Sequence, residues 1–156
     1  FIHFFPAVMQ AYWSALARED LATAAAVIER IDRPPSDLAL ARRFLTERFE
    51  RKESVLIVAE DDQGALIGFT QLYPTFCSVR AAHTFVLYDL FVTPAARGTG
   101  AGRALMLAAE AHARKAGAAR MELSTAKTNV VGQALYESLG WERDISYLVY
   151  GRDLRD

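Results

Sequence analysis

The sequence has a single cysteine, Cys77, and no long run of apolar residues. One cysteine excludes an intrachain disulfide and makes a cytoplasmic location the default expectation. The longest apolar stretches are too short to span a bilayer. The 18 basic and 19 acidic residues nearly balance and form no basic run, so neither nucleic acid nor a membrane surface is expected as a partner. No group of His, Cys, Asp and Glu has metal-ligand spacing, so no metal site is predicted.

The residues that are present suit one folded domain over residues 1–156, because 52% of them are hydrophobic and 24% are charged. Apolar periodicity and turn residues predict helices over about 8–16, 21–31 and 36–49, strands over 54–60, 65–73 and 83–92, a helix over 100–117, a strand over 119–125, a helix over 130–139 and closing strands within 141–152. Pro74 is expected to end the second strand. This order predicts an α/β (α+β) fold with one mixed central sheet, in which the crossover rule makes strands 83–92 and 119–125 parallel.

The stretch from Tyr88 to Gly102 changes from a strand to a glycine-rich loop and then opens a helix. Gly98, Gly100 and Gly102 lack Cβ atoms, so an anion can approach the backbone closely. The first turn of a helix offers N–H groups without intrahelical partners at the positive end of the helix dipole. A strand that delivers such a loop to a helix N-terminus predicts a phosphate-binding site.

Two common phosphate-binding patterns do not fit this loop. The P-loop requires Gly-Lys-Ser/Thr, whereas Gly102 is followed by Arg103-Ala104, and the dinucleotide pattern G-x-G-x-x-G lacks its third glycine in both registers. What remains is Arg97-x-x-Gly100-x-Gly102, preceded by Val92-x-Pro94. This pattern resembles motif A of the GCN5-related N-acetyltransferases, the GNAT superfamily.

The resemblance implies a site for acetyl-coenzyme A and a sheet whose two parallel strands splay apart. The pantetheine arm would lie between these strands and pair with the backbone of Leu90, Phe91 and Val92. The pyrophosphate would be held by the Arg97 side chain and by the backbone N–H groups of Arg97, Gly98, Thr99, Gly100, Ala101 and Gly102. Arg103 would reach a phosphate, unless it is an ordinary solvated residue of the helix.

A second set of residues, Asn129, then Ala134-Leu135-Tyr136-Glu137, then Leu139-Gly140-Trp141, resembles motif B of the same family. The resemblance implies that Asn129 contacts the pantetheine arm and that the Tyr136 hydroxyl protonates the leaving thiolate. From the residues alone, Asn129 is equally suited to cap a helix, and Tyr136 to be a core residue with its hydroxyl at the surface.

The residue that removes a proton from the acceptor amine is less clearly marked. The segment from Leu87 to Val92 is similar to the diamine acetyltransferase branch of the family, which carries Glu-Asp where this chain has Tyr88-Asp89. Asp89 therefore matches an acidic position, while the glutamate is missing. A carboxylate in an apolar strand needs a partner or a raised pKa. Glu122 on the neighbouring strand, or a water, is the alternative base.

The resulting prediction is an acetyltransferase that moves the acetyl group of acetyl-CoA to the primary amine of a polyamine-, amino-acid- or drug-like molecule. The amine would attack directly in a ternary complex, with Tyr136 and Asp89 as catalytic residues. A non-catalytic acyl-CoA-binding regulatory module and an acetyltransferase acting on a protein amine are the alternatives, since fold does not fix function. Relatives are often dimers, so a homodimer is also expected.

Overall fold

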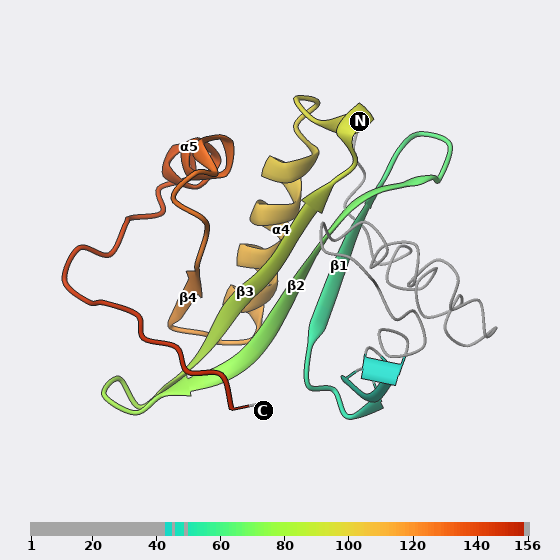
Figure 1. Ribbon diagram of the computed structural model, residues 1–156. Helices are drawn as coiled ribbons and strands as arrows, with labels where there is room; N and C mark the ends of the chain where they lie inside the picture. Colours follow the sequence, from blue (N-terminus) through green and yellow to red (C-terminus); the bar gives the residue numbers. More distant parts are fainter. Residues whose placement is uncertain (1–42, 45, 49, 155–156) are drawn as a thin grey trace. The chain divides into compact units, whose positions relative to one another are not determined.

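The computed structural model describes residues 43–44, 46–48 and 50–154 (Figure 1). The chain divides after Ser124 into two compact units. The helices expected over 8–16 and 21–31, and most of the helix expected over 36–49, lie outside the described residues. The described residues from 43 to 50 are helical, as expected for the end of the third helix. The prediction of a single domain over residues 1–156 stays a prediction.

The first unit is built on one mixed sheet, whose strands are β1 (Val55–Glu60), β2 (Leu66–Cys77), β3 (Ala82–Val92) and β4 (Arg120–Leu123). They lie in the order β1-β2-β3-β4, with antiparallel pairing between the first three and parallel pairing between β3 and β4. The 3₁₀ turn η1 (Pro94–Ala96) and the helix α4 (Ala101–Lys115) connect β3 to β4 (Figure 1). The predicted fold class and the predicted parallel pair are confirmed.

A glycine allows α4 to approach the sheet closely. A Cβ atom at Gly68 on β2 would lie 3.2 Å from the Leu105 side chain and 2.6 Å from the Phe91 carbonyl oxygen. Leu105 and Met106 of α4 and Leu72 of β2 are completely buried, at 0% exposure, and form the centre of the core. Burial of apolar side chains of this size stabilises the fold by about 1.5–3 kcal/mol each. The core therefore fixes α4 against the sheet.

The prediction that Pro74 ends the second strand is wrong. β2 continues through Pro74 to Cys77, and Pro74 pairs with Phe85 of β3. Strand β1 pairs with β2 only as far as Leu72, so beyond that residue β2 has a described neighbour on one side alone. Proline lacks an N–H group, and it is tolerated where a strand has a free side. Pro74 can therefore lie within β2 because β1 is too short to pair with β2 at that position.

The second unit contains the helix α5 (Val130–Ser138), which confirms the helix expected over 130–139. The closing strands expected within 141–152 are absent, because the described residues 141–154 have no regular secondary structure. Asp144 gives a local reason: its Oδ1 atom accepts hydrogen bonds from the backbone N–H groups of Ser146 at 2.8 Å and Tyr147 at 3.0 Å. Such a turn competes with an extended strand. None of the helices described is both long and apolar enough to cross a membrane.

Candidate active site

The glycine loop contains two glycines in a conformation that other residues rarely adopt. Gly98 and Gly100 have φ angles of 79° and 96°, in the left-handed region, and Gly100 is the N-cap of α4. A Cβ atom at either glycine would meet nothing within 4 Å. The glycines are therefore required by backbone conformation, and the space in front of them is open. A loop that binds a phosphate through its backbone N–H groups needs both this backbone conformation and this open space.

Some backbone N–H groups of the loop donate hydrogen bonds within the loop, and others have no acceptor among the described residues. Those of Arg97 and Thr99 donate to the carbonyl oxygens of Pro94 and Ala96, at 3.3 and 3.4 Å. Among the described residues, nothing accepts a hydrogen bond from the N–H groups of Gly98, Gly100 and Gly102. Since α4 has no acidic residue in its first turn and no side-chain cap, its positive end is not neutralised from within that turn. The loop is chemically suited to an anion.

The Arg97 side chain links the loop to the end of β3. Its Nε atom donates to the Val92 carbonyl oxygen at 3.1 Å, while the residue remains exposed. The Val92 carbonyl oxygen thus has one protein partner, and the predicted pairing of Leu90, Phe91 and Val92 with pantetheine stays a prediction. The Arg97 guanidinium has further N–H groups besides the bound Nε, and such groups suit a phosphate. Arg103 is exposed on the first turn of α4.

The two parallel strands separate early. β3 pairs with β4 only from Thr84↔Arg120 to Leu87↔Leu123. From Tyr88 to Val92, β3 is paired with β2 on one side and has no strand partner among the described residues on the other. Leu90, Phe91 and Val92 are half-buried there. Unpaired backbone groups on this edge can pair with an extended ligand, as a strand would.

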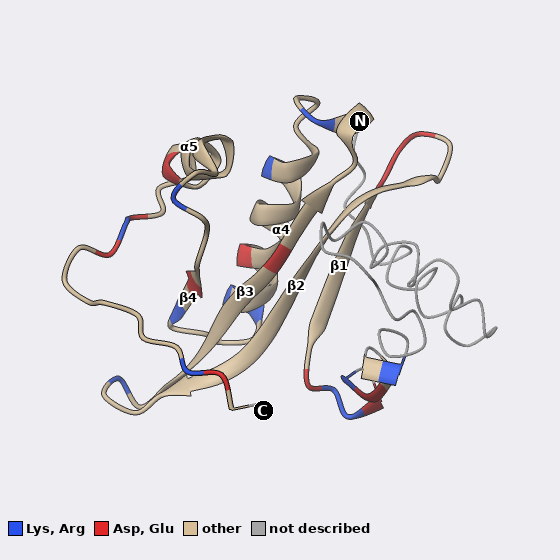
Figure 2. Ribbon diagram, viewed as in Figure 1, with Lys and Arg blue, Asp and Glu red and all other residues tan. Residues whose placement is uncertain are grey.

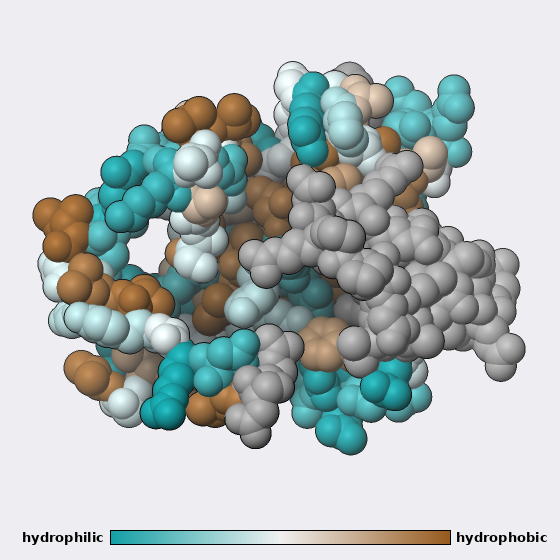
Figure 3. All heavy atoms as spheres, in the orientation of Figure 1, coloured by the Kyte–Doolittle hydropathy of each residue, from teal (hydrophilic) through white to brown (hydrophobic). Residues whose placement is uncertain are grey.

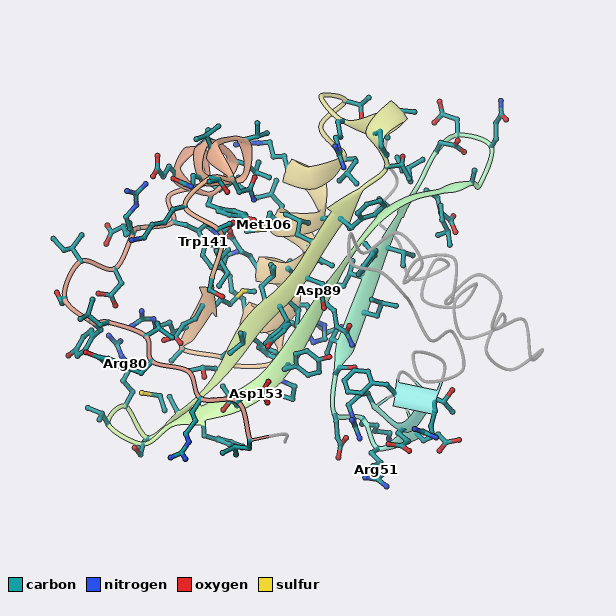
Figure 4. The ribbon with its side chains drawn as sticks, in the orientation of Figure 1. Arg51, Arg80, Asp89, Met106, Trp141 and Asp153 are labelled. Atoms are coloured by element: carbon teal, nitrogen blue, oxygen red, sulfur yellow. The ribbon has the colours of Figure 1, made fainter. Side chains whose placement is uncertain are left out.

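Asp89 lies on β3 within the sheet (Figure 4). It is the only Asp, Glu, Lys or Arg in β2 and β3, whose strands are otherwise uncharged (Figure 2). Burial raises the pKa of its carboxyl group, as expected for a carboxylate in an apolar strand. Among the described residues, none forms an ion pair with it. A half-buried carboxylate of this kind is suited to bind a cation or to accept a proton.

A β-bulge determines how Asp89 is held. Gln71 pairs with Asp89, but the next residue of β2, Leu72, pairs with Leu87, so Tyr88 is an extra residue in β3. Bulges change the direction of side chains and are frequent next to active sites. The hydroxyl of Thr70, which is completely buried at 0% exposure, donates to the Asp89 carbonyl oxygen at 2.8 Å. Sequence reasoning missed Thr70, because no local pattern marks a residue that supports a bulge in the next strand.

Glu122, the alternative base, is in a different environment. Its carboxylate lies 3.2 Å from the Nε atom of Arg120, and its side chain is 55% exposed. An exposed carboxylate that already has a cationic partner is less available to a cationic amine than a half-buried one without such a partner. Asp89 is therefore the better candidate of the two.

In the second unit, Asn129 is the N-cap of α5. Its Oδ1 atom accepts a hydrogen bond from the Gly132 N–H at 3.1 Å, and its Nδ2 atom donates to the Thr125 hydroxyl at 3.0 Å. The capping role considered from the sequence is thus present, and one Nδ2 hydrogen is left for a ligand. Burial raises the pKa of the Tyr136 hydroxyl, and a hydrogen bond with Thr125 partly offsets the effect. Thr125 therefore interacts with both predicted residues, although no sequence pattern indicated it.

The predicted site residues fall into two groups. The first unit brings together Asp89, the edge from Leu90 to Val92 and the loop from Arg97 to Arg103. The second unit brings Asn129 and Tyr136 together around Thr125. Among the described residues, no group of three or more His, Cys, Asp and Glu side chains is arranged to hold a metal ion.

Comparison with known proteins identifies the same family that the sequence of the glycine loop resembles. The chain matches the acetyltransferase (GNAT) family over residues 13–141. YhfO of Bacillus subtilis (strain 168), an uncharacterized N-acetyltransferase, is 46% identical over 118 residues, which are 76% of this chain and 78% of that protein. The crystal structure of a probable acetyltransferase superposes with a TM-score of 0.78 at 34% identity, over 88% of this chain and 92% of that one.

A further solved structure shows the same fold with a ligand bound. AAC(6')-Iy, in complex with the bisubstrate analogue CoA-S-monomethyl-acetylneamine, is 19% identical and superposes with a TM-score of 0.72, over 85% of this chain and 91% of that one. The family match covers well over half of the chain, and the Bacillus relative shares nearly half of the aligned residues. The chain therefore belongs to the GNAT family of N-acetyltransferases. The resemblance to the diamine branch stays a prediction.

Proposed function

We propose that this protein transfers the acetyl group of acetyl-CoA to the primary amine of a small molecule, by direct attack in a ternary complex. The observation that carries the proposal is the end of β3. A strand edge with no strand partner among the described residues leads there into a loop with two left-handed glycines and a helix N-terminus without a side-chain cap. This arrangement fits both halves of the co-substrate, since the strand edge suits the amides of pantetheine and the loop suits a pyrophosphate. Asn129 would add a contact to pantetheine.

The residues of the chain would supply the proton transfers. An amine reaches the enzyme at neutral pH mostly as the ammonium, so the Asp89 carboxylate would attract it and accept its proton, directly or through water. The neutral nitrogen then forms the C–N bond as the C–S bond of the thioester breaks. Tyr136, whose hydroxyl pKa is raised by burial, would give its proton to the departing thiolate, and the resulting phenolate would take up the second proton that the acetylated nitrogen releases.

Binding of acetyl-CoA at the glycine loop is tested by a matched pair of substitutions at the two ends of α4. Gly100 and Gly117 both have positive φ angles, 96° and 73°, and both have open space where a Cβ would lie. Gly100→Glu and Gly117→Glu therefore impose similar backbone strain, but only the first puts a carboxylate in front of the helix N-terminus. Isothermal titration calorimetry should show acetyl-CoA affinity lost in Gly100→Glu alone. Equal affinities in the two variants would contradict the proposed site.

Transfer to an amine is tested by thiol release from acetyl-CoA across polyamines, amino acids, aminoglycosides and peptides. Release that depends on a small amine, with the acetylated amine detected by mass spectrometry, is expected. Binding of acetyl-CoA with no release for any acceptor would instead indicate the regulatory module, and release with peptides alone would indicate a protein acceptor.

We also propose that the protein is a homodimer. The second unit exposes Ile145, Tyr147, Leu148, Val149 and Tyr150, each at 80% or more, and Figure 3 shows apolar residues along this segment. Apolar surface of this kind is usually covered in solution. Light scattering should give the mass of a dimer, and Leu148→Asp with Tyr150→Asp should give a monomer. A monomeric wild type would contradict the proposal.

The cytoplasmic location remains a prediction based on the single cysteine.

A further inference from the structure

Two tyrosines lie beside Asp89 on the sheet. The ring of Tyr73 on β2 meets the ring of Tyr88 on β3 edge to face, with centroids 5.5 Å apart and an interplanar angle of 89°. The negative charge of Asp89 acts on the Tyr73 hydroxyl and helps to raise its pKa, after burial, which is the larger cause. Tyr73, Tyr88 and Asp89 thus form one cluster, here called the tyrosine–aspartate cluster.

The bulge in β3 explains why three such residues gather. In a regular strand, Tyr88 and Asp89 would point to opposite faces of the sheet. Tyr73 is two residues from Gln71, the partner of Asp89, so Tyr73 and Asp89 belong to the same face. Because Tyr88 is the extra residue of the bulge, its ring also reaches Tyr73 while remaining 71% exposed. The bulge therefore presents an aromatic ring to solvent next to a half-buried carboxylate.

The charges around the cluster favour a cation as its ligand. The positive group that acts on Tyr73 is Arg48, and this side chain is already engaged. Its guanidinium lies 2.5 Å from the Glu53 carboxylate and 3.4 Å from that of Glu47, and it stacks at 4.9 Å from the Phe44 ring centroid. Among the described residues, no cation is paired with Asp89. The cluster thus joins an unneutralised carboxylate to two electron-rich rings, which is the chemistry that recognises ammonium groups.

We infer that the tyrosine–aspartate cluster is a specificity subsite for an acceptor that carries a second positive charge besides the amine to be acetylated. The inference rests on the proposed function and adds the class of acceptor. With the reacting nitrogen at Asp89, a second ammonium over the rings would lie about two residues further along β2, which is roughly 7 Å away. An alkyl chain of four or five carbons spans that length.

The test compares two probes that differ by one ammonium, 1,5-diaminopentane and 1-aminopentane. In the wild type, kcat/KM is expected to be higher for the diamine by roughly 3- to 30-fold, the range of a cation–π contact at a partly exposed site. Tyr88→Leu should remove this preference, whereas Tyr88→Phe, which keeps the ring, should retain most of it. Phe76→Leu is the matched control, because Phe76 is also an exposed aromatic residue, at 82%, of the same hairpin but lies outside the cluster.

Binding without turnover gives a second readout. Protein labelled with ¹³C in its tyrosine rings would be titrated with each probe, and the signals of Tyr73 and Tyr88 assigned through their Phe variants. We expect saturable shifts of both signals with the diamine and much weaker ones with the monoamine. Equal shifts with both probes, or none with either, would overturn the subsite. If neither probe nor any other amine is acetylated while the shifts persist, the proposed transfer fails and the cation subsite stands.

Discussion

Thr70→Val tests whether the bulge in β3 is held from the neighbouring strand. Valine has nearly the shape of threonine but lacks the hydroxyl that donates to the Asp89 carbonyl oxygen at 2.8 Å. A neutral hydrogen bond contributes about 0.5–1.5 kcal/mol to stability, and a buried carbonyl left without its partner costs up to about 1–3 kcal/mol. Because Thr70 has 0% exposure, water cannot easily replace the hydroxyl. We therefore expect a loss of about 1–2 kcal/mol in the free energy of unfolding.

The matched control is Thr84→Val. Thr84 is also buried, at 5% exposure, and lies in the adjoining strand, but its hydroxyl has no hydrogen-bond partner among the described residues. The same chemical change there should leave stability nearly unaltered or slightly raised. Urea denaturation gives the free energy of unfolding for both variants, and equal slopes of the two transitions show that the comparison is valid.

Kinetics separate a positioning role of Thr70 from a merely structural one. A shift of the bulge by a fraction of an ångström would move Asp89, and a misplacement near 1 Å can cost about 100-fold in rate. We expect kcat/KM for the amine to fall by roughly 10- to 100-fold in Thr70→Val, with acetyl-CoA affinity unchanged. Thr70→Ser should restore most of the rate, since it restores the hydroxyl. If Thr70→Val and Thr84→Val behave alike in stability and kinetics, the reasoning is refuted.

Two further substitutions address the proposed proton transfers. Asp89→Asn should lower kcat/KM for the amine and remove the acid limb of its pH profile. In the wild type this limb should lie above the ordinary carboxyl pKa, because burial raises the pKa of Asp89. An unchanged profile would indicate that Glu122 or water is the base. The same variant should be more stable than the wild type at neutral pH. This gain should shrink as pH falls through the raised pKa, and vanish below the unfolded value of about 3.9, where the carboxyl is protonated in both states. Tyr136→Phe should lower kcat by roughly 10²–10⁴-fold while calorimetry shows normal acetyl-CoA binding, and near-normal turnover would remove Tyr136 from the mechanism.

What the sequence predicted best are features that depend on neighbouring residues. The start of α4 is one, since a helix start is a local property, and α4 begins at Ala101, next to the expected start at Gly100. The capping role of Asn129 is another, because its partner Gly132 lies three residues away. Both follow from backbone hydrogen bonds within one turn.

What the sequence did not predict depends on residues far apart in the chain. Whether Pro74 ends a strand is decided by where β1 begins, at Val55. The contact between Tyr73 and Tyr88 depends on a shift of register between two strands, which no local pattern encodes. The closing strands are absent from the described residues for a local reason, because the Asp144 side chain accepts hydrogen bonds from the Ser146 and Tyr147 N–H groups and so favours a turn.

The short stretch of pairing between β3 and β4 has a consequence for the order of folding. The β2–β3 hairpin joins residues that are close in sequence, whereas the parallel pairing of β3 with β4 must wait until η1 and α4 close a long crossover. Local contacts form early because they cost less loop entropy. We expect the hairpin to be structured in the folding transition state and β4 to dock afterwards, so that Leu123→Ala accelerates unfolding more than it slows folding, whereas Leu72→Ala slows folding. The tyrosine–aspartate cluster, which lies on β2 and β3, would thus form before β4 docks and the two parallel strands separate beyond Leu87.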